Sequence, residues 1–185
     1  MSKNVNKSLL NLVLSAMFLA IALILPLLTG QIKEFGNMLL PMHIPVMLCG
    51  LICGWQYGLT IGLLSPILRS VLFAMPIMFP SAIAMALELA TYGLVVGILF
   101  QKARWKCIKS LYRCLLISMV SGRVVWGIVE CILLGIGENG FTISMFVTSA
   151  IVKAIPGIIL QLLLIPTVML MLGKTHLVHI KHDKE

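Results

Sequence analysis

The stretch LLNLVLSAMFLAIALILPLL, residues 9–28, holds no charged side chain. A helix of this length, at 1.5 Å of rise per residue, spans a hydrocarbon core of roughly 30 Å. The basic residues before it, Lys3 and Lys7, resemble the start of a signal peptide, but the apolar run is longer than a signal-peptide core and no clear cleavage pattern follows it. The stretch is therefore predicted to be a first membrane-spanning helix.

Similar apolar segments recur along the whole chain. Of its 185 residues, 60% are hydrophobic and only 11% are charged, whereas soluble domains have roughly 25% charged residues. The sequence predicts an all-α integral membrane protein, with residues 1–185 forming one domain of six transmembrane helices. The predicted helices cover residues 8–28, 41–54, 57–74, 79–100, 111–135 and 143–172. Residues 54–58, GWQYG, are predicted to form a tight turn between the second and the third helix.

The basic residues predict the topology of this bundle. Lysine and arginine gather at the N-terminus, in the 102–113 segment and in the tail from residue 173 onward, which fall on one side if six helices alternate. Cytoplasmic loops carry such an excess, so both termini are predicted to be cytoplasmic. The net charge of +8 does not indicate nucleic acid, because no aromatic stacking platform accompanies it. The odd cysteine count (five) favours reduced thiols.

Five formally charged residues lie inside the predicted spans: Arg69, Glu88, Arg123, Glu130 and Lys153. Each costs roughly 2.5–3.5 kcal/mol near a helix centre, so such residues usually face a bundle interior or a cavity. By helical rise, they and His43 fall in the outer half of the membrane. Three cations against two anions leave one cation unpaired, which favours an anionic ligand.

One face of the helix at 111–135 carries Arg123, Trp126 and Glu130, spaced so that it can hold charge and stack a planar group. The glycine-rich loop after it contributes Asn139. The candidate ligand-binding residues are His43, Arg69, Glu88, Arg123, Trp126, Glu130, Asn139 and Lys153. No metal site is predicted.

Two other readings compete with a ligand site. Buried charges can simply pair with one another and lock helices together. They could also perform acid–base chemistry on a lipid, as in an intramembrane enzyme. The sequence contains neither an HExxH motif nor a Gly-x-Ser-x-Gly turn, so we do not expect an enzyme.

Several short motifs carry a resemblance to a known family. They are Ala16-x-x-x-Ala20, LPMHIPVMLCG (residues 40–50), GWQYG (54–58), GLLSP (62–66) and ELATYG (88–93). With them the chain resembles the substrate-binding S components of energy-coupling factor (ECF) transporters, six-helix proteins that capture vitamins in the plasma membrane of prokaryotes. The resemblance covers essentially the whole chain.

The resemblance implies partners and a place for the ligand. Ala16 and Ala20 would contact the transmembrane coupling (T) subunit, and two cytoplasmic ATPase subunits would use ATP, so this chain needs no cofactor of its own. The ligand would lie near the outer face, held by helices 4 to 6 and the loops above them.

The resemblance also narrows the substrate. Metal-transporting members use a histidine at the N-terminus, whereas this chain begins MSKNV, so a vitamin is expected. An excess of cations fits a monocarboxylate such as pantothenate better than cationic thiamine. Lipoate, niacin, pyridoxine and hydroxymethylpyrimidine stay open.

Overall fold

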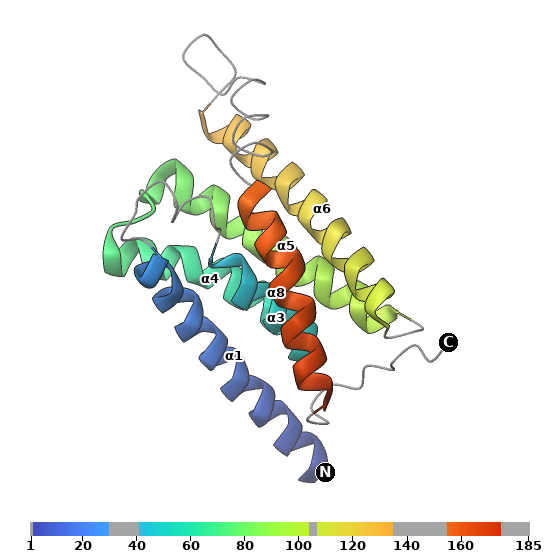
Figure 1. Cartoon of the computed structure of the whole chain (residues 1–185). Helices are drawn as coiled ribbons and strands as arrows, with labels where there is room; N and C mark the ends of the chain where they lie inside the picture. The colour runs from blue at the N-terminus through green and yellow to red at the C-terminus, as the bar shows by residue number, and fades with distance from the viewer. Residues whose placement is uncertain (1, 30–40, 104–106, 135–154, 175–185) are drawn as a thin grey trace.

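The computed structural model describes residues 2–29, 41–103, 107–134 and 155–174 (Figure 1). Within these ranges the chain forms α-helices, one short helical segment that is interrupted at Phe79, whose backbone is extended, and no strand. The helices are α1 (Ser2–Thr29), α3 (His43–Ile52), α4 (Trp55–Phe73), η1 (Met78–Ala82), α5 (Ile83–Lys102), α6 (Ile108–Leu134) and α8 (Ile155–Lys174). The prediction of an all-helical chain is confirmed for this part of the protein.

Four of these helices are long and apolar enough to cross a membrane. The apolar segments are Lys7–Leu27 in α1, Met78–Lys102 in η1 and α5, Ile108–Leu134 in α6 and Ile155–Gly173 in α8. Helix α3 is apolar but has only ten residues. Gln56 and Arg69 lower the hydropathy of α4. That all six helices cross the bilayer therefore stays a prediction.

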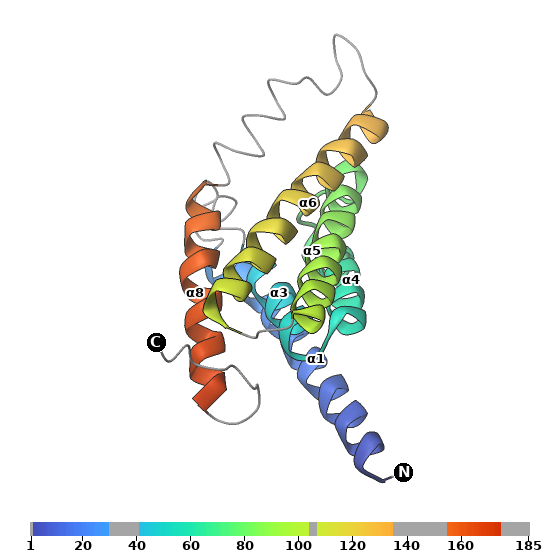
Figure 2. The ribbon, with the colours of Figure 1, turned by 90° about the vertical axis from the view of Figure 1, so that its right-hand side faces the viewer.

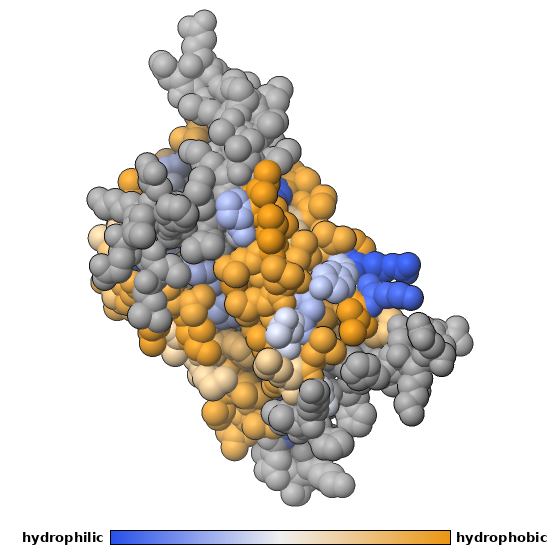
Figure 3. Space-filling model, viewed as in Figure 1, coloured by the Kyte–Doolittle hydropathy of each residue, from blue (hydrophilic) through white to orange (hydrophobic). Residues whose placement is uncertain are grey.

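The outer surface of the bundle is apolar. Large hydrophobic side chains are widely exposed, for example Ile132 at 74% and Leu163 at 64%. Figure 3 shows one apolar face, on which orange residues form a continuous surface between the few polar ones. A surface of this kind is suited to lipid and not to water.

Four helix ends come together at one end of the bundle. Figures 1 and 2 place the start of α1, the end of α5, the start of α6 and the end of α8 toward the same end, which we call the basic end. The helices α3, α5 and α8 begin toward the opposite end, where α6 finishes. Which end of the bundle faces the cytoplasm stays a prediction from the distribution of lysine and arginine.

A glycine seam joins α3, α4 and α5, and consists of Gly50, Gly58, Gly62, Gly93 and Gly97. A Cβ atom added at Gly93 would lie 2.3 Å from the carbonyl oxygen of Gly58, and one at Gly62 would lie 2.4 Å from that of Leu89. Glycine therefore lets these backbones touch. Gly58 on α4 meets Gly93 on α5, and Gly62, further along α4, meets Leu89, earlier on α5, so the two helices are antiparallel. Helix α3, also antiparallel to α4, then runs parallel to α5.

Some predicted element bounds differ from the structure. The prediction of a tight turn over residues 54–58 is wrong, because only Gly54 leaves the helical conformation, with φ 108°, and α4 already begins at Trp55. Glycine adopts this backbone conformation without a steric penalty, which lets α4 start directly after α3. The predicted start of the last helix at residue 143 lies outside the described residues.

Candidate functional site

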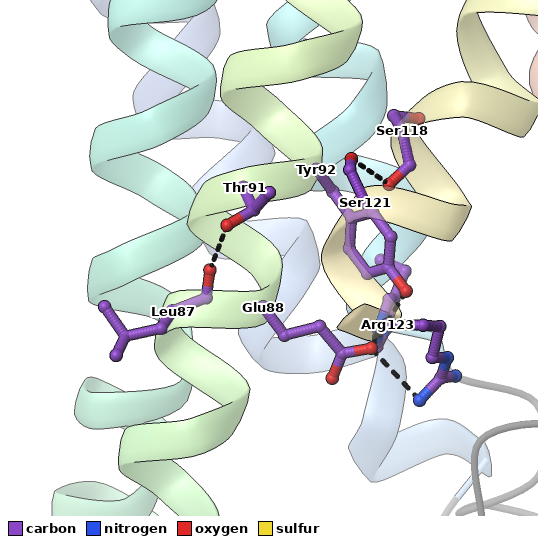
Figure 4. Close-up of polar contacts among 8 residues, drawn as sticks. Leu87, Glu88, Thr91, Tyr92, Ser118, Ser121 and Arg123 are labelled. Carbon is purple, nitrogen blue, oxygen red and sulfur yellow. Dashed lines mark hydrogen bonds and ion pairs between the residues drawn. The ribbon is translucent and has the colours of Figure 1, made fainter. Parts of the chain in front are cut away.

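A buried carboxylate on α5 organises the polar interior. Glu88 is 2% exposed. Its Oε1 atom accepts a hydrogen bond of 2.9 Å from the hydroxyl of Tyr92 and lies 3.0 Å from Nη1 of Arg123 on α6 (Figure 4). The second oxygen of Glu88 points away from Arg123 in the same view.

His43, at the start of α3, completes this group. The imidazole is buried, with 1% of the residue exposed, and its ring centroid lies 5.1 Å from that of Tyr92. Its Nε2 atom is 3.6 Å from Oε1 of Glu88, which is longer than a hydrogen bond. Neither ring nitrogen has a hydrogen-bond partner among the described residues. We call His43, Glu88, Tyr92 and Arg123 the Glu88 cluster.

The register of the glycine seam explains why His43 meets Glu88. An added Cβ at Gly50 would lie 2.6 Å from the carbonyl oxygen of Gly93, so the parallel helices α3 and α5 touch there. His43 lies about 10 Å before Gly50 along α3, and Glu88 about 8 Å before Gly93 along α5. Both side chains therefore arrive at nearly the same level, toward the end opposite the basic end.

Gly122 allows α6 to pack closely against the cluster. A Cβ at Gly122 would lie 2.5 Å from the ring of Tyr92, so the absence of a side chain there lets the tyrosine pack directly against α6. Arg123 follows next in the chain, and Glu88 lies one turn from Tyr92 on α5. The close approach of the two helices thus sets the arginine beside the carboxylate.

The electrostatics of the cluster make its members interdependent. The side chain of Glu88 is 3% exposed and that of Arg123 is 16% exposed, so water screens their attraction weakly. Removing one partner of such a pair leaves an uncompensated charge in the interior. The pair of Glu88 with His43 adds to this attraction only when the imidazole is protonated.

The other predicted ligand residues on α6 lie close by. Trp126 is half-buried and Glu130 is 6% exposed. Glu130 follows Arg123 by seven positions, about 10 Å along α6. Arg123, Trp126 and Glu130 therefore follow one side of α6, as their spacing predicted.

The structure does not place Arg69 in the cluster. Its Nε atom donates a 3.0 Å hydrogen bond to the carbonyl oxygen of Met75, just beyond the end of α4. Asn139 and Lys153 lie outside the described residues. The predicted excess of cations depended on Arg69 and Lys153, so among the described residues around Glu88 only Arg123 is a permanent cation, against the two carboxylates of Glu88 and Glu130.

The sequence reasoning missed several buried polar residues, and two of them bear on the candidate site. Tyr92 follows Glu88 by four positions, and that spacing alone could have revealed the pair. Gln161 on α8 is 2% exposed, and its Nε2 atom has no hydrogen-bond partner among the described residues. An amide within the apolar sequence of α8 was its only signal. No group of three potential metal ligands occurs in the described part of the chain.

Comparison with known proteins identifies the family of this chain. A family model described as "ECF transporter, substrate-specific component" matches residues 10–169. The chain belongs to this family. A search of curated proteins and a search of solved structures find no match.

Membership confirms the resemblance seen in the sequence motifs. S components are subunits of transporters and not enzymes, and they reside in the prokaryotic plasma membrane as multi-pass proteins. They associate with T and ATPase modules and with small-molecule substrates. The matched residues run from α1 into α8 and include the whole Glu88 cluster and Gln161.

Proposed function

We propose that this S component captures a vitamin or a related small organic molecule in the outer half of the membrane, for uptake driven by ATP hydrolysis in its partner subunits. The basic end of the bundle is assigned to the cytoplasm, because Lys and Arg concentrate there. The Glu88 cluster then faces the outer half. No cofactor is assigned to this chain.

The observation that carries the proposal is the buried imidazole of His43, which has no hydrogen-bond partner in the described part of the chain. A buried polar group without a hydrogen bond costs about 1–3 kcal/mol, and native proteins rarely retain one. A purely structural lock accounts for the ion pair of Glu88 with Arg123. It does not account for an imidazole whose Nε2 atom lies 3.6 Å from Glu88 and whose two nitrogens have no hydrogen-bond partner among the described residues, whereas a bound ligand would supply one.

Pantothenate is the first candidate substrate. A guanidinium has five N–H donors, so Arg123 can bind a ligand carboxylate while Nη1 stays with Glu88. Lys153, predicted to lie at similar depth, would supply the second positive charge.

The balance of charge around Glu88 favours a second candidate class, an uncharged aromatic heterocycle such as pyridoxine or hydroxymethylpyrimidine. Such a ring would hydrogen-bond to His43 and need no excess cation.

The partner surface is assigned to α1. Ala16 and Ala20 are both exposed, four positions apart on the same side of the helix. Small residues in this arrangement let another helix approach closely. We assign them to contact with the T subunit, which connects this chain to two ATPase subunits.

The test is ligand-dependent thermal stabilisation of the purified protein, since selective binding stabilises the native state. The panel contains pantothenate, its decarboxylated analogue, lipoate, niacin, pyridoxine, hydroxymethylpyrimidine and thiamine. We expect one of these to raise the unfolding temperature of the wild type and not of His43→Phe, which keeps a ring but removes both nitrogens. A silent panel would refute the proposal. Turnover of labelled lipid would instead support the enzymatic reading.

His43→Phe also separates a binding site from a structural lock. If the imidazole serves a ligand, the ligand-free variant is at least as stable as the wild type, because an unpaired polar group has been removed. If the imidazole holds the helices together, the ligand-free variant unfolds at a lower temperature. Tyr112→Phe, at an exposed aromatic residue on α6, is the control for handling and expression.

A further inference from the structure

Helix α8 presents one buried stripe to the rest of the bundle. Its members are Gly157, Gln161, Ile165 and Met169, which recur every fourth position, while Ile159, Leu163 and Met171 on the other side are exposed. Ile165 and Met169 belong to the hydrophobic core. Among the described helices, α8 packs mainly against α3 and α6, so the stripe faces these two.

Gln161 is the one polar side chain in this stripe. It is 2% exposed, so its amide is removed from both lipid and water, and its Nε2 atom has no hydrogen-bond partner in the described part of the chain. The apolar residues at the next two positions of the stripe show that α8 can bury its inner face without an amide. An unpaired amide here lowers the stability of the ligand-free protein.

The position of Gln161 along α8 relates it to the Glu88 cluster. Helix α8 begins toward the same end of the bundle as α3 and α5 (Figures 1 and 2). Gln161 lies one turn from Ile165 in the direction of that end, where His43 opens α3 and Glu88 lies near the start of α5. The helices that α8 contacts, α3 and α6, are those that carry His43 and Arg123.

From these observations we infer that Gln161 is a substrate-binding residue, whose amide N–H donates to a neutral acceptor on the ligand, a carbonyl, hydroxyl or ring nitrogen. This inference rests on the proposed function. The ligand is then recognised at two points. One of its groups binds at the Glu88 cluster, and a separate uncharged acceptor accepts a hydrogen bond from Gln161 on α8. Gly157 lies one turn further toward the ligand end of α8 and is also buried.

The experiment replaces Gln161 with Met, which has a similar length and shape but no amide, and measures both stability and affinity. The probe is whichever vitamin of the panel stabilises the wild type. We expect Gln161→Met without ligand to unfold at the wild-type temperature or above it. We expect its Kd to rise about three- to tenfold, the value of one neutral hydrogen bond.

The control is Gln56→Met, the same change at an exposed glutamine in the first turn of α4. It should leave the Kd unchanged. Gln161→Leu serves as a second variant, and failure of both Gln161 variants to fold would assign the amide a structural role and overturn the inference.

The remaining outcomes separate this inference from the proposed function. Wild-type binding with an unchanged Kd in Gln161→Met overturns the inference alone. Lower stability without ligand together with an unchanged Kd also overturns it, as a structural amide. Absence of binding by the wild type to any member of the panel overturns the proposed function and the inference with it.

Discussion

Replacing Arg123 with Met should destabilise the protein strongly, because the buried carboxylate of Glu88 then loses its ion-pair partner. That carboxylate is 3% exposed, and Nη1 of Arg123 lies 3.0 Å from its Oε1 atom. Breaking a buried ion pair from one side costs roughly 3–5 kcal/mol. We expect a value of about 3 kcal/mol, the lower end of that range, because the hydroxyl of Tyr92 still donates to the same oxygen.

The assay is reversible unfolding of the detergent-solubilised protein, followed by a double-mutant cycle with Glu88→Gln. The double variant should be more stable than Arg123→Met alone, because a neutral amide needs no cation. Arg113→Met, at an exposed arginine on the same helix, is the matched control and should change stability little. Wild-type stability of Arg123→Met, or strictly additive losses in the double variant, would refute the ion pair as the organising contact.

Three further changes test other parts of the structure. Tyr92→Phe removes the hydroxyl that donates to Glu88 and should lower the free energy of unfolding by about 1–2 kcal/mol, measured in the same assay. Gly93→Ala should lower it by about 3 kcal/mol, because the new Cβ would lie 2.3 Å from the backbone oxygen of Gly58. Ala16→Leu should reduce co-purification with the T subunit while ligand-induced stabilisation stays at the wild-type level.

Each of these changes has a counterpart that should have little effect. Tyr112→Phe is the control for the hydroxyl of Tyr92, and Leu87→Ala, at an exposed residue of α5, is the control for the glycine seam. For the α1 surface, Val13→Leu enlarges another exposed residue of the same helix. Equal losses in a variant and its control would show that the predicted contact is not responsible.

The helices could be predicted well from the sequence because the length and hydropathy of an apolar segment are enough to identify a membrane helix. Charge alone also identified Glu88 and Arg123 as residues that must face the interior, and the structure pairs them. The turn at residues 54–58 was predicted wrongly because glycine and aromatic residues there suggested a loop. In the structure Gly58 is part of the contact between α4 and α5.

The composition of the site could be predicted only in part, because pairing depends on register. Arg69 lies in a predicted span like Arg123, yet it donates a hydrogen bond to the carbonyl oxygen of Met75, just beyond the end of its own helix. Gly122 has no side chain, so Tyr92 packs directly against α6 and the neighbouring Arg123 lies beside Glu88. No hydropathy pattern contains that information.

The packing also divides the candidate site into a fixed part and an adjustable part. His43 and Glu88 are positioned by α3 and α5, whose backbones touch along the glycine seam, so a shift of one helix against the other would produce backbone clashes. Gln161 lies on α8, whose inner stripe packs against α3 and α6 through Ile165 and Met169, and side chains of this kind can repack. A ligand that bonds to both parts would therefore lie between helices joined by backbone contacts and a helix held by side-chain packing. Substitutions in the seam should then affect folding first, whereas substitution of Gln161 on α8 should affect affinity first.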